Sequence, residues 1–117
     1  MAAQDHTEGR RAEDLAARFL SQQGLLILEK NYRLRGGEVD LIAKDGSVLV
    51  FVEVRYRASE AFGGASESIT HQKQQKIIRA ASYYLARLPK TPVCRFDCLL
   101  FDSLAKEPTW LKNAFEL

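Results

Sequence analysis

Four charged residues flank one predicted tight turn, Asp45-Gly46: they are Glu38, Asp40, Glu53 and Arg55. An Asp-Gly pair between two apolar runs is one of the strongest short signals for a β-hairpin. Side chains alternate between the two faces along a strand, and residues opposite each other in a hairpin share a face. The four residues are therefore predicted to project together, so that three carboxylates converge beside one cation.

The type of hairpin decides which of these side chains face one another. A two-residue loop at Asp45-Gly46 places Glu38 opposite Glu53. The same loop places Asp40 opposite Phe51. A four-residue loop would shift the pairs but keep the common face, whereas a three-residue loop would send the two sets to opposite faces.

Carboxylates clustered on a central strand destabilise one another, because like charges raise each other's pKa and burial disfavours the ionised form. Two kinds of compensation fit the sequence. In the first, Arg55 and Arg57 pair with the acids in a structural network at the end of the sheet. In the second, the carboxylate oxygens bind a hard divalent cation, Mg²⁺ or Mn²⁺, which keeps water ligands for a substrate phosphate. The residues alone leave both open.

Two charged residues on predicted helices lie in or beside an apolar stripe. Lys73 stands between Ile69 and Ile77, where a charge is unexpected unless it reaches an acid, a phosphate or the helix end. A lysine whose stem follows the surface to solvent explains the position equally well. Glu13 lies at the edge of the first helix's stripe and is able to lean toward the acidic cluster, although surface acids are also common in the N-terminal half of a helix.

The periodicity of apolar residues predicts an α/β fold in the order α-β-β-β-α-β, with a mixed sheet flanked by helices. The third strand is apolar on both faces, so we expect it to be central. A packing tail containing Trp110 follows the last strand. The predicted helices cover residues 7–23 and the segment from the N-cap Ser68 to Pro89, and the predicted strands cover 25–33, 38–43, 47–56 and 93–101.

Composition bounds the class of protein. The chain has 117 residues, of which 46% are apolar and 27% charged, and shows neither linker nor repeat, which indicates a single domain over residues 1–117. No apolar stretch approaches the ~20 residues of a membrane-spanning helix and no signal peptide is visible, so we expect a cytoplasmic protein without membrane contact. Cys94 and Cys98 are expected to be reduced packing residues.

Several motifs occur in order at fitting spacing across nearly the whole chain, and together they resemble the YraN-like bacterial family. They are Glu-Gly-Arg-Arg-Ala-Glu-Asp-Leu-Ala at 8–16, Asn31-Tyr32-Arg33, Gly-Gly-Glu-Val-Asp-Leu-Ile-Ala at 36–43, Phe-Val-Glu-Val-Arg at 51–55 with Arg57, Phe62-Gly63, Ile69 with Lys73, and Arg95-Phe96-Asp97. The family is classed with endonucleases similar to Holliday-junction resolvases. The resemblance therefore implies a restriction-endonuclease-like αβββαβ core.

The resemblance also implies roles for individual residues. Asp40 and Glu53 match the two metal-binding acids of the nuclease motif, and Glu13 matches a helix glutamate near the metal. Arg55 departs from the family pattern, which usually has lysine there. An arginine stays charged near neutral pH, so Arg55 would bind phosphate but not act as a base. Lys73 matches a lysine of the family's second helix and would supply the missing ammonium.

Three functions follow as hypotheses. The first is a Mg²⁺- or Mn²⁺-dependent nuclease that hydrolyses phosphodiester bonds in DNA, including branched DNA, with Glu38 and Glu13 completing the acidic shell and a homodimer supplying two sites. The second is a nucleic-acid-binding protein without turnover on the same scaffold, using cations such as Lys76 and Arg79. The third is a protein-interaction module whose partner surface includes Trp110.

Overall fold

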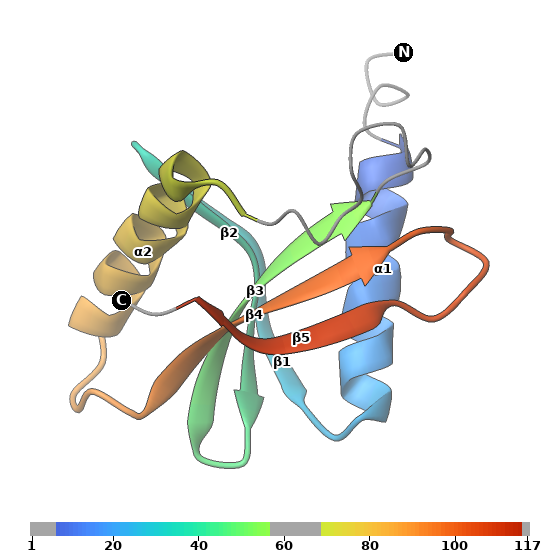
Figure 1. Ribbon diagram of the computed structural model, residues 1–117. Helices are drawn as coiled ribbons and strands as arrows, with labels where there is room; N and C mark the ends of the chain where they lie inside the picture. The colour runs from blue at the N-terminus through green and yellow to red at the C-terminus, as the bar shows by residue number, and fades with distance from the viewer. Residues whose placement is uncertain (1–6, 57–68, 116–117) are drawn as a thin grey trace.

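A mixed five-stranded sheet with one helix packed on each face forms the body of the molecule in the computed structural model (Figure 1). The structure describes residues 7–56 and 69–115, so that Arg57, Phe62-Gly63 and Ser68 lie outside the described residues. The elements are α1 (Thr7–Gln22), β1 (Leu26–Leu34), β2 (Gly37–Asp45), β3 (Val48–Tyr56), α2 (His71–Ala86), β4 (Cys94–Phe101) and β5 (Thr109–Phe115). In the described part of the chain, neither helix has the length and apolarity needed to cross a membrane.

The sheet has the spatial order β1-β2-β3-β4-β5, with β3 at its centre as predicted. The strands pair antiparallel except for β3 and β4, which run parallel and are joined across α2. A parallel pair needs a crossover connection, and the helix supplies it. The predicted α-β-β-β-α-β order and mixed sheet are therefore confirmed, with one strand added.

The additional strand is β5, which the sequence analysis treated as a packing tail. It pairs antiparallel with β4 from Leu100 opposite Thr109 to Phe96 opposite Phe115, with a register shift between. Asn113 within it has a positive φ of 55°. Because most of its side chains are exposed at this sheet edge, β5 lacks the alternation of apolar and polar residues that marks a half-buried strand.

The second helix begins two residues later than predicted. Its N-cap is Thr70, whose Oγ1 accepts a hydrogen bond from the Lys73 backbone N–H at 3.1 Å. A threonine hydroxyl at this position satisfies one of the free amides of the first helical turn. The helix ends at Ala86, before Pro89, which was the predicted end of the helical segment.

The predicted hairpin exists, but its register differs by two residues from the prediction. Asp45 pairs with Val48 and Leu41 pairs with Val52, so the turn is Gly46-Ser47 rather than Asp45-Gly46. Gly46 takes a positive φ of 63°, which glycine adopts without steric cost. Extending this register aligns Asp40 with Glu53 instead of Phe51, and a shift of two keeps both carboxylates on the common face.

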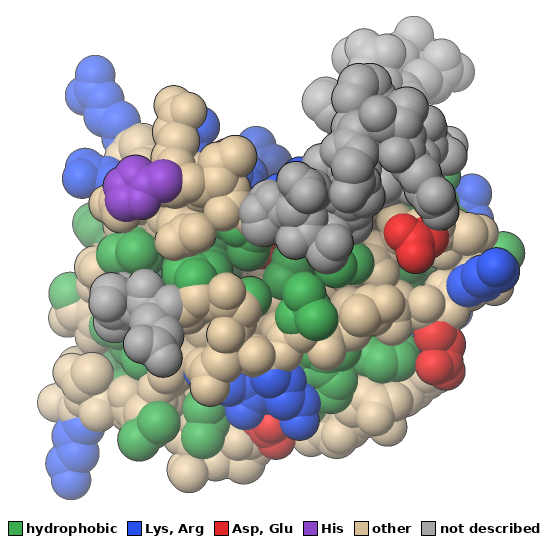
Figure 2. Space-filling view, in the orientation of Figure 1, with side chains coloured by type: hydrophobic (Ala, Val, Ile, Leu, Met, Phe, Trp, Pro, Cys, Tyr) green, Lys and Arg blue, Asp and Glu red, His purple; other side chains and the backbone are tan. Residues whose placement is uncertain are grey.

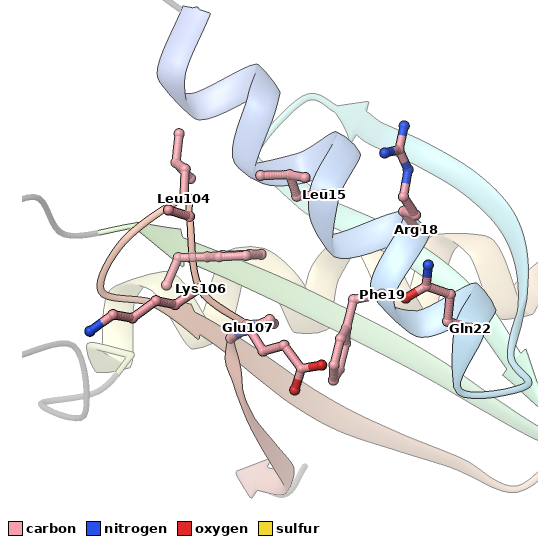
Figure 3. Close-up of a pocket in the computed structure, with 10 residues that line it drawn as sticks. Leu15, Arg18, Phe19, Gln22, Leu104, Lys106 and Glu107 are labelled. Atoms are coloured by element: carbon pink, nitrogen blue, oxygen red, sulfur yellow. The ribbon is translucent and has the colours of Figure 1, made fainter.

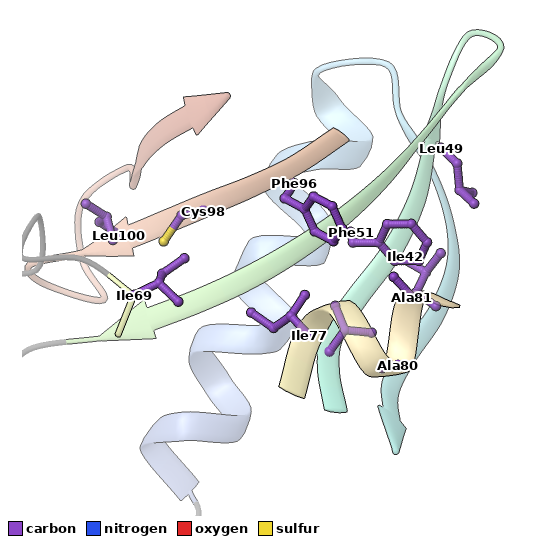
Figure 4. Close-up of a cluster of buried hydrophobic side chains, with 11 residues drawn as sticks. Ile42, Leu49, Phe51, Ile69, Ile77, Ala80, Ala81, Phe96, Cys98 and Leu100 are labelled. Carbon is purple, nitrogen blue, oxygen red and sulfur yellow. The ribbon is translucent and has the colours of Figure 1, made fainter. Parts of the chain in front are cut away.

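Two apolar clusters fill the space between the sheet and its helices. The α2-side core joins Ile77, Ala80 and Ala81 of the helix to strand residues that include Ile42 and Phe51 (Figure 4). The α1-side core packs the alanine-rich face of α1 against the other side of β2, β3 and β4. Cys94 and Cys98 are both free thiols, and Cys98 is buried, in agreement with a packing role.

Candidate functional site

Asp40 lies where β2 separates from β3. The ladder between these strands ends at the pair Leu41 and Val52. Beyond it, the Asp40 carboxylate replaces the missing backbone acceptor, because its Oδ2 accepts a hydrogen bond from the Val54 N–H at 2.8 Å. This bond fixes the Asp40 side chain beside the next acid on β3, Glu53.

Glu53 is a buried carboxylate whose hydrogen-bonding capacity the described residues fill only in part. Its residue surface is 5% exposed, and its Oε1 is buried without a hydrogen-bond partner in the described structure. Burial, reinforced by the charge of Asp40 and opposed by Lys73, raises the pKa of Glu53 to about 8. At neutral pH, the site therefore binds a proton on Glu53 unless another positive charge takes its place.

Lys73 reaches from α2 into this acidic cluster. Its Nζ donates to Glu38 Oε2 at 2.6 Å and lies 3.6 Å from Glu53 Oε2. Burial opposes the ammonium, but the hydrogen bond to Glu38 and the nearby carboxylates outweigh burial and raise the pKa of Lys73. The same hydrogen bond lowers the pKa of Glu38, so the pair is ionised. Of the two interpretations of Lys73 in the sequence, the one that reaches an acid is confirmed.

Glu13 approaches the cluster from the opposite helix. Burial and the charge of Asp40 raise the pKa of Glu13, whereas a hydrogen bond with Asn31 and the charge of Arg33 lower it. Asp40 thus acts on both Glu13 of α1 and Glu53 of β3, so of the two alternatives for Glu13 the structure favours the one that leans toward the acids. Asn31 was not among the predicted site residues. The sequence feature that could have indicated Asn31 is an asparagine within a predicted strand. Asparagine tolerates a positive φ, and Asn31 has a φ of 51°.

Arg55 follows Glu53 by two residues on β3 and is half-buried. Its positive charge lowers the pKa of Glu53, against the effect of burial. Arg57, the other arginine of the predicted structural network, lies outside the described residues. Lys73 of α2 contacts two of the acids directly.

The carboxylates fit a divalent cation held by two protein ligands rather than by a complete protein cage. No set of three or more Asp, Glu, His or Cys side chains within residues 7–56 and 69–115 is arranged to hold a metal ion. Mg²⁺, however, commonly binds through one or two carboxylates and keeps several waters. Asp40 and Glu53 provide such a pair, and the unpartnered Glu53 Oε1 is a free oxygen ligand. Glu38 and Glu13 remain predicted ligands, with Glu38 occupied by Lys73.

Basic residues lie near Glu38 on the side of the β1–β2 turn. The charges of Arg33 and Lys76 act on Glu38, and both lower its pKa. Arg79 Nε donates to the backbone oxygen of Arg35 at 2.8 Å, which ties the turn to α2. Figure 2 shows Lys and Arg side chains around the histidine at this end of the molecule. We call four residues of the β1–β2 turn region and of α2 the basic rim: Arg33, Arg35, Lys76 and Arg79.

Trp110, considered for a partner surface, and the aromatic residues Tyr32 and Phe115 are engaged in packing. Tyr32 lies edge-to-face with Tyr84, with ring centroids 5.3 Å apart. Trp110 lies edge-to-face with Phe19 at 6.0 Å. Phe115 stacks on Phe96 at 4.7 Å. The C-terminal aromatics thus cover this protein's own core.

A second polar network is centred on Asp97, and it was not predicted from the sequence. Asp97 is fully buried and accepts hydrogen bonds from Arg95 Nε at 3.1 Å, Trp110 Nε1 at 2.9 Å and the Asn113 N–H at 3.0 Å. Arg95 also pairs with Asp45 at 2.9 Å. The motif Arg95-Phe96-Asp97 could have indicated this network, because Arg95 and Asp97 are two residues apart on a strand and so share a face. All its partners are protein groups, so this network fastens β5 to the sheet.

One cavity of about 210 Å³ lies between α1 and the segment that joins β4 to β5 (Figure 3). Leu15, Phe19 and Leu104 contribute apolar surface, and Arg18 and Glu107 contribute opposite charges. None of the clustered carboxylates lines it. The acidic cluster and this cavity are separate features.

Fold and site together define an α/β protein whose mixed sheet carries a lysine-bridged carboxylate cluster between its two helices. The model of the uncharacterised protein family UPF0102 matches residues 12–101, and the chain belongs to this family. The chain is 54% identical over 108 residues to a UPF0102 protein of Janthinobacterium sp. (strain Marseille), covering 92% of this chain and 86% of the relative. It is 52% identical over 109 residues to a UPF0102 protein of Nitrosomonas eutropha, covering 93% of each chain. The predicted YraN-like membership is thereby confirmed, and the similarity to resolvases stays a prediction.

Proposed function

We propose that this protein is a metal-dependent nuclease that hydrolyses phosphodiester bonds in DNA, including branched or otherwise structured DNA. The observation that carries the proposal is the pair Asp40 and Glu53. One carboxylate is fixed by a backbone N–H, and the other is buried with an oxygen that lacks a partner. Mg²⁺ or Mn²⁺ fits this pair, and the basic rim supplies the positive potential that a polyanion needs.

Each side chain has a distinct part in the proposed reaction. Asp40 and Glu53 would hold the ion, and the Val54 N–H keeps the Asp40 carboxylate oriented. When bound, Mg²⁺ polarises the phosphate and makes a bound water more acidic. Arg55 stabilises negative charge on the phosphate, because its guanidinium does not act as a base. Lys73 holds Glu38 and Glu53 in place as a cation.

The proposal is tested by cleavage of supercoiled plasmid, single-stranded DNA and a four-way junction in Mg²⁺ or Mn²⁺. We expect Asp40→Asn to reduce the rate by about a thousandfold. Asp14→Asn is the matched control, since Asp14 is an exposed acid of α1 whose only described ion pair is with Lys30 at 3.6 Å. Equal activity of the Asp40 variant and the wild type would remove the assignment of Asp40.

A second candidate function is nucleic-acid binding without turnover, which the arginine at position 55 favours. In this case, Lys76 and Arg79 bind phosphates and the carboxylate pair has a structural part. Replacing either cation with Gln should reduce the slope of log K against log salt by about one, because one phosphate is then no longer neutralised. Salt-sensitive binding without cleavage across a screen of divalent metals would support this function, whereas cleavage would exclude it.

We further propose that the protein acts in the cytoplasm and that two copies associate on DNA. Cutting both strands of a duplex or junction needs two active sites, and a symmetric homodimer supplies them. Light scattering with and without a four-way junction measures this directly. A stable monomer that cuts both strands in one encounter would contradict the dimer.

A further inference from the structure

A second surface with binding character lies at the opposite end of the sheet from the carboxylate cluster. There, residues at the C-terminal end of α2, in the segment after it and in the β2–β3 hairpin line a common space. A cavity of about 400 Å³ opens between them. Its walls are mainly apolar and include Leu28, Leu49, Tyr84 and Leu88, while Lys44 and Lys90 are among its exposed residues. We call this cavity the hairpin cleft.

The charged side chains that line the hairpin cleft have one sign. Lys44 and Lys90 line it together with no acid, and neither lysine has a carboxylate partner among the described residues. Near the cleft, the charge of Glu29 raises the pKa of Tyr84 and the charge of Arg87 lowers it, so these two charges oppose each other. The cleft thus combines an apolar floor with two unneutralised ammonium groups at its mouth.

The apolar surface continues beyond the cleft along the edge strand β1. Leu26 pairs in register with Lys44, so both side chains stand on the same face of the sheet. Leu26 is 61% exposed and adds apolar surface on the face that carries Lys44. An extended ligand would cover both the cleft and Leu26, whereas a small molecule enclosed by the cleft would leave Leu26 in water.

We propose that the hairpin cleft binds a peptide segment of a partner protein in which bulky apolar side chains are flanked by carboxylates. The apolar side chains enter the cleft beside Leu49 and Leu88. The flanking carboxylates pair with Lys44 and Lys90. The site is separate from Asp40 and Glu53, and it does not depend on the proposed nuclease activity.

The test is a titration of the full ¹⁵N-labelled chain with the synthetic peptide acetyl-Glu-Leu-Phe-Glu-amide, followed by backbone amide chemical shifts. We expect the largest shifts around Leu28, Leu49 and Leu88, and none at Asp40. The basic peptide acetyl-Lys-Leu-Phe-Lys-amide should bind about tenfold more weakly, because its charges are repelled by both lysines.

Variants in which the charges of both lysines are reversed separate the electrostatic part of peptide binding from the apolar part. Lys44→Glu/Lys90→Glu should invert the preference, so that the basic peptide binds more tightly than the acidic one. Arg10→Glu/Arg11→Glu gives the same change in net charge on exposed residues of α1 and should leave the preference unchanged. Equal affinity for both peptides, shifts confined to other surfaces, or binding of decanoate but not of the acidic peptide would each overturn the proposal.

Discussion

At the scale of single residues, the site depends on how three charged groups share a confined space. Asp40 and Glu53 repel each other, and burial disfavours charge on Glu53. Lys73 compensates part of this charge but binds Glu38 more closely, at 2.6 Å against 3.6 Å for Glu53. The cluster is therefore short of positive charge at Glu53, which is where a divalent cation would stabilise it.

The raised pKa of Glu53 predicts a pH-dependent loss of stability. Below pH 4.5 the residue is protonated in both the folded and the unfolded chain and has no effect. Between pH 4.5 and about 8, the unfolded chain releases the proton while the folded chain keeps it, so the free energy of unfolding falls. Above about pH 8 this contribution is constant.

Urea unfolding of wild type and Glu53→Gln between pH 5 and 8 measures this effect. The wild type should lose up to about 1.4 kcal/mol per pH unit relative to the variant. Added Mg²⁺ at pH 8 should stabilise the wild type but not Glu53→Gln. Glu107→Gln, which removes an exposed carboxylate, is the control. Parallel pH profiles for wild type and Glu53→Gln would show that Glu53 is not the protonated group.

Lys73→Met should destabilise the protein, because it leaves Glu38 and Glu53 without their shared cation. The ammonium is partly exposed, so we expect a loss of about 1–2 kcal/mol in the free energy of unfolding. Lys76→Met, which removes an exposed lysine three residues later, should change it by less than about 0.5 kcal/mol. Equal losses for both variants would contradict the bridging role of Lys73.

The common face of the acids was predictable from the strand period alone, but their partners were not. A shift of two residues in register preserves the face, so the convergence of Asp40 and Glu53 survived an error in the turn. The bond from the Val54 N–H to Asp40 could not be predicted, because it exists only where the ladder ends. The partners of Lys73 depend on where α2 crosses the sheet, which no local pattern encodes.

At the scale of elements, a polar network holds the edge strand β5, whose sequence shows little alternation of apolar and polar residues. Asp97 binds Arg95, the Trp110 indole and a backbone N–H of β5. Apolar alternation did not reveal this strand, since its attachment relies on these bonds and on the stacking of Phe115 on Phe96. A buried polar network of this kind is costly to break, because it leaves unpaired groups behind.

Asp97→Ala should therefore loosen β5 and destabilise the fold. The loss should be about 3–5 kcal/mol, because the Arg95 guanidinium loses a fully buried partner. Trp110 is the only tryptophan of the chain, so its fluorescence reports the change directly. Asp102→Ala, at an exposed position near the end of the same strand, is the control. Unchanged emission and stability in Asp97→Ala would contradict the network.

The contact between the β1–β2 turn and α2 leaves no room for a side chain at Gly37. A Cβ there would lie 3.0 Å from the Ala80 nitrogen and 3.2 Å from the Lys76 oxygen, both backbone atoms. Gly37→Ala should cost about 1–3 kcal/mol and displace the turn with its basic rim. Urea unfolding measures the cost, and a change below about 0.5 kcal/mol would show that the two elements are not closely packed.

At the scale of the whole molecule, the topology brings distant parts of the chain to one place. Acids from α1, β2 and β3 meet beside a lysine from α2, which lies thirty-five residues from its partner Glu38. The parallel pairing of β3 and β4 places α2 across the sheet, opposite α1 (Figure 1). The element order was predictable from the sequence, which offered the approach of Lys73 and Glu13 to the acids only as one alternative for each, and the assembled fold decides between the alternatives.

The most direct test of the account is a crystal of the protein soaked in Mn²⁺ and measured at the manganese absorption edge. We predict one anomalous peak about 2.1 Å from carboxylate oxygens of both Asp40 and Glu53. The peak should be absent in Asp40→Asn and retained in Asp14→Asn. A well-ordered cluster without a peak, with Lys73 still bridging Glu38 and Glu53, would contradict the metal site and leave the cluster as a structural ion-pair network.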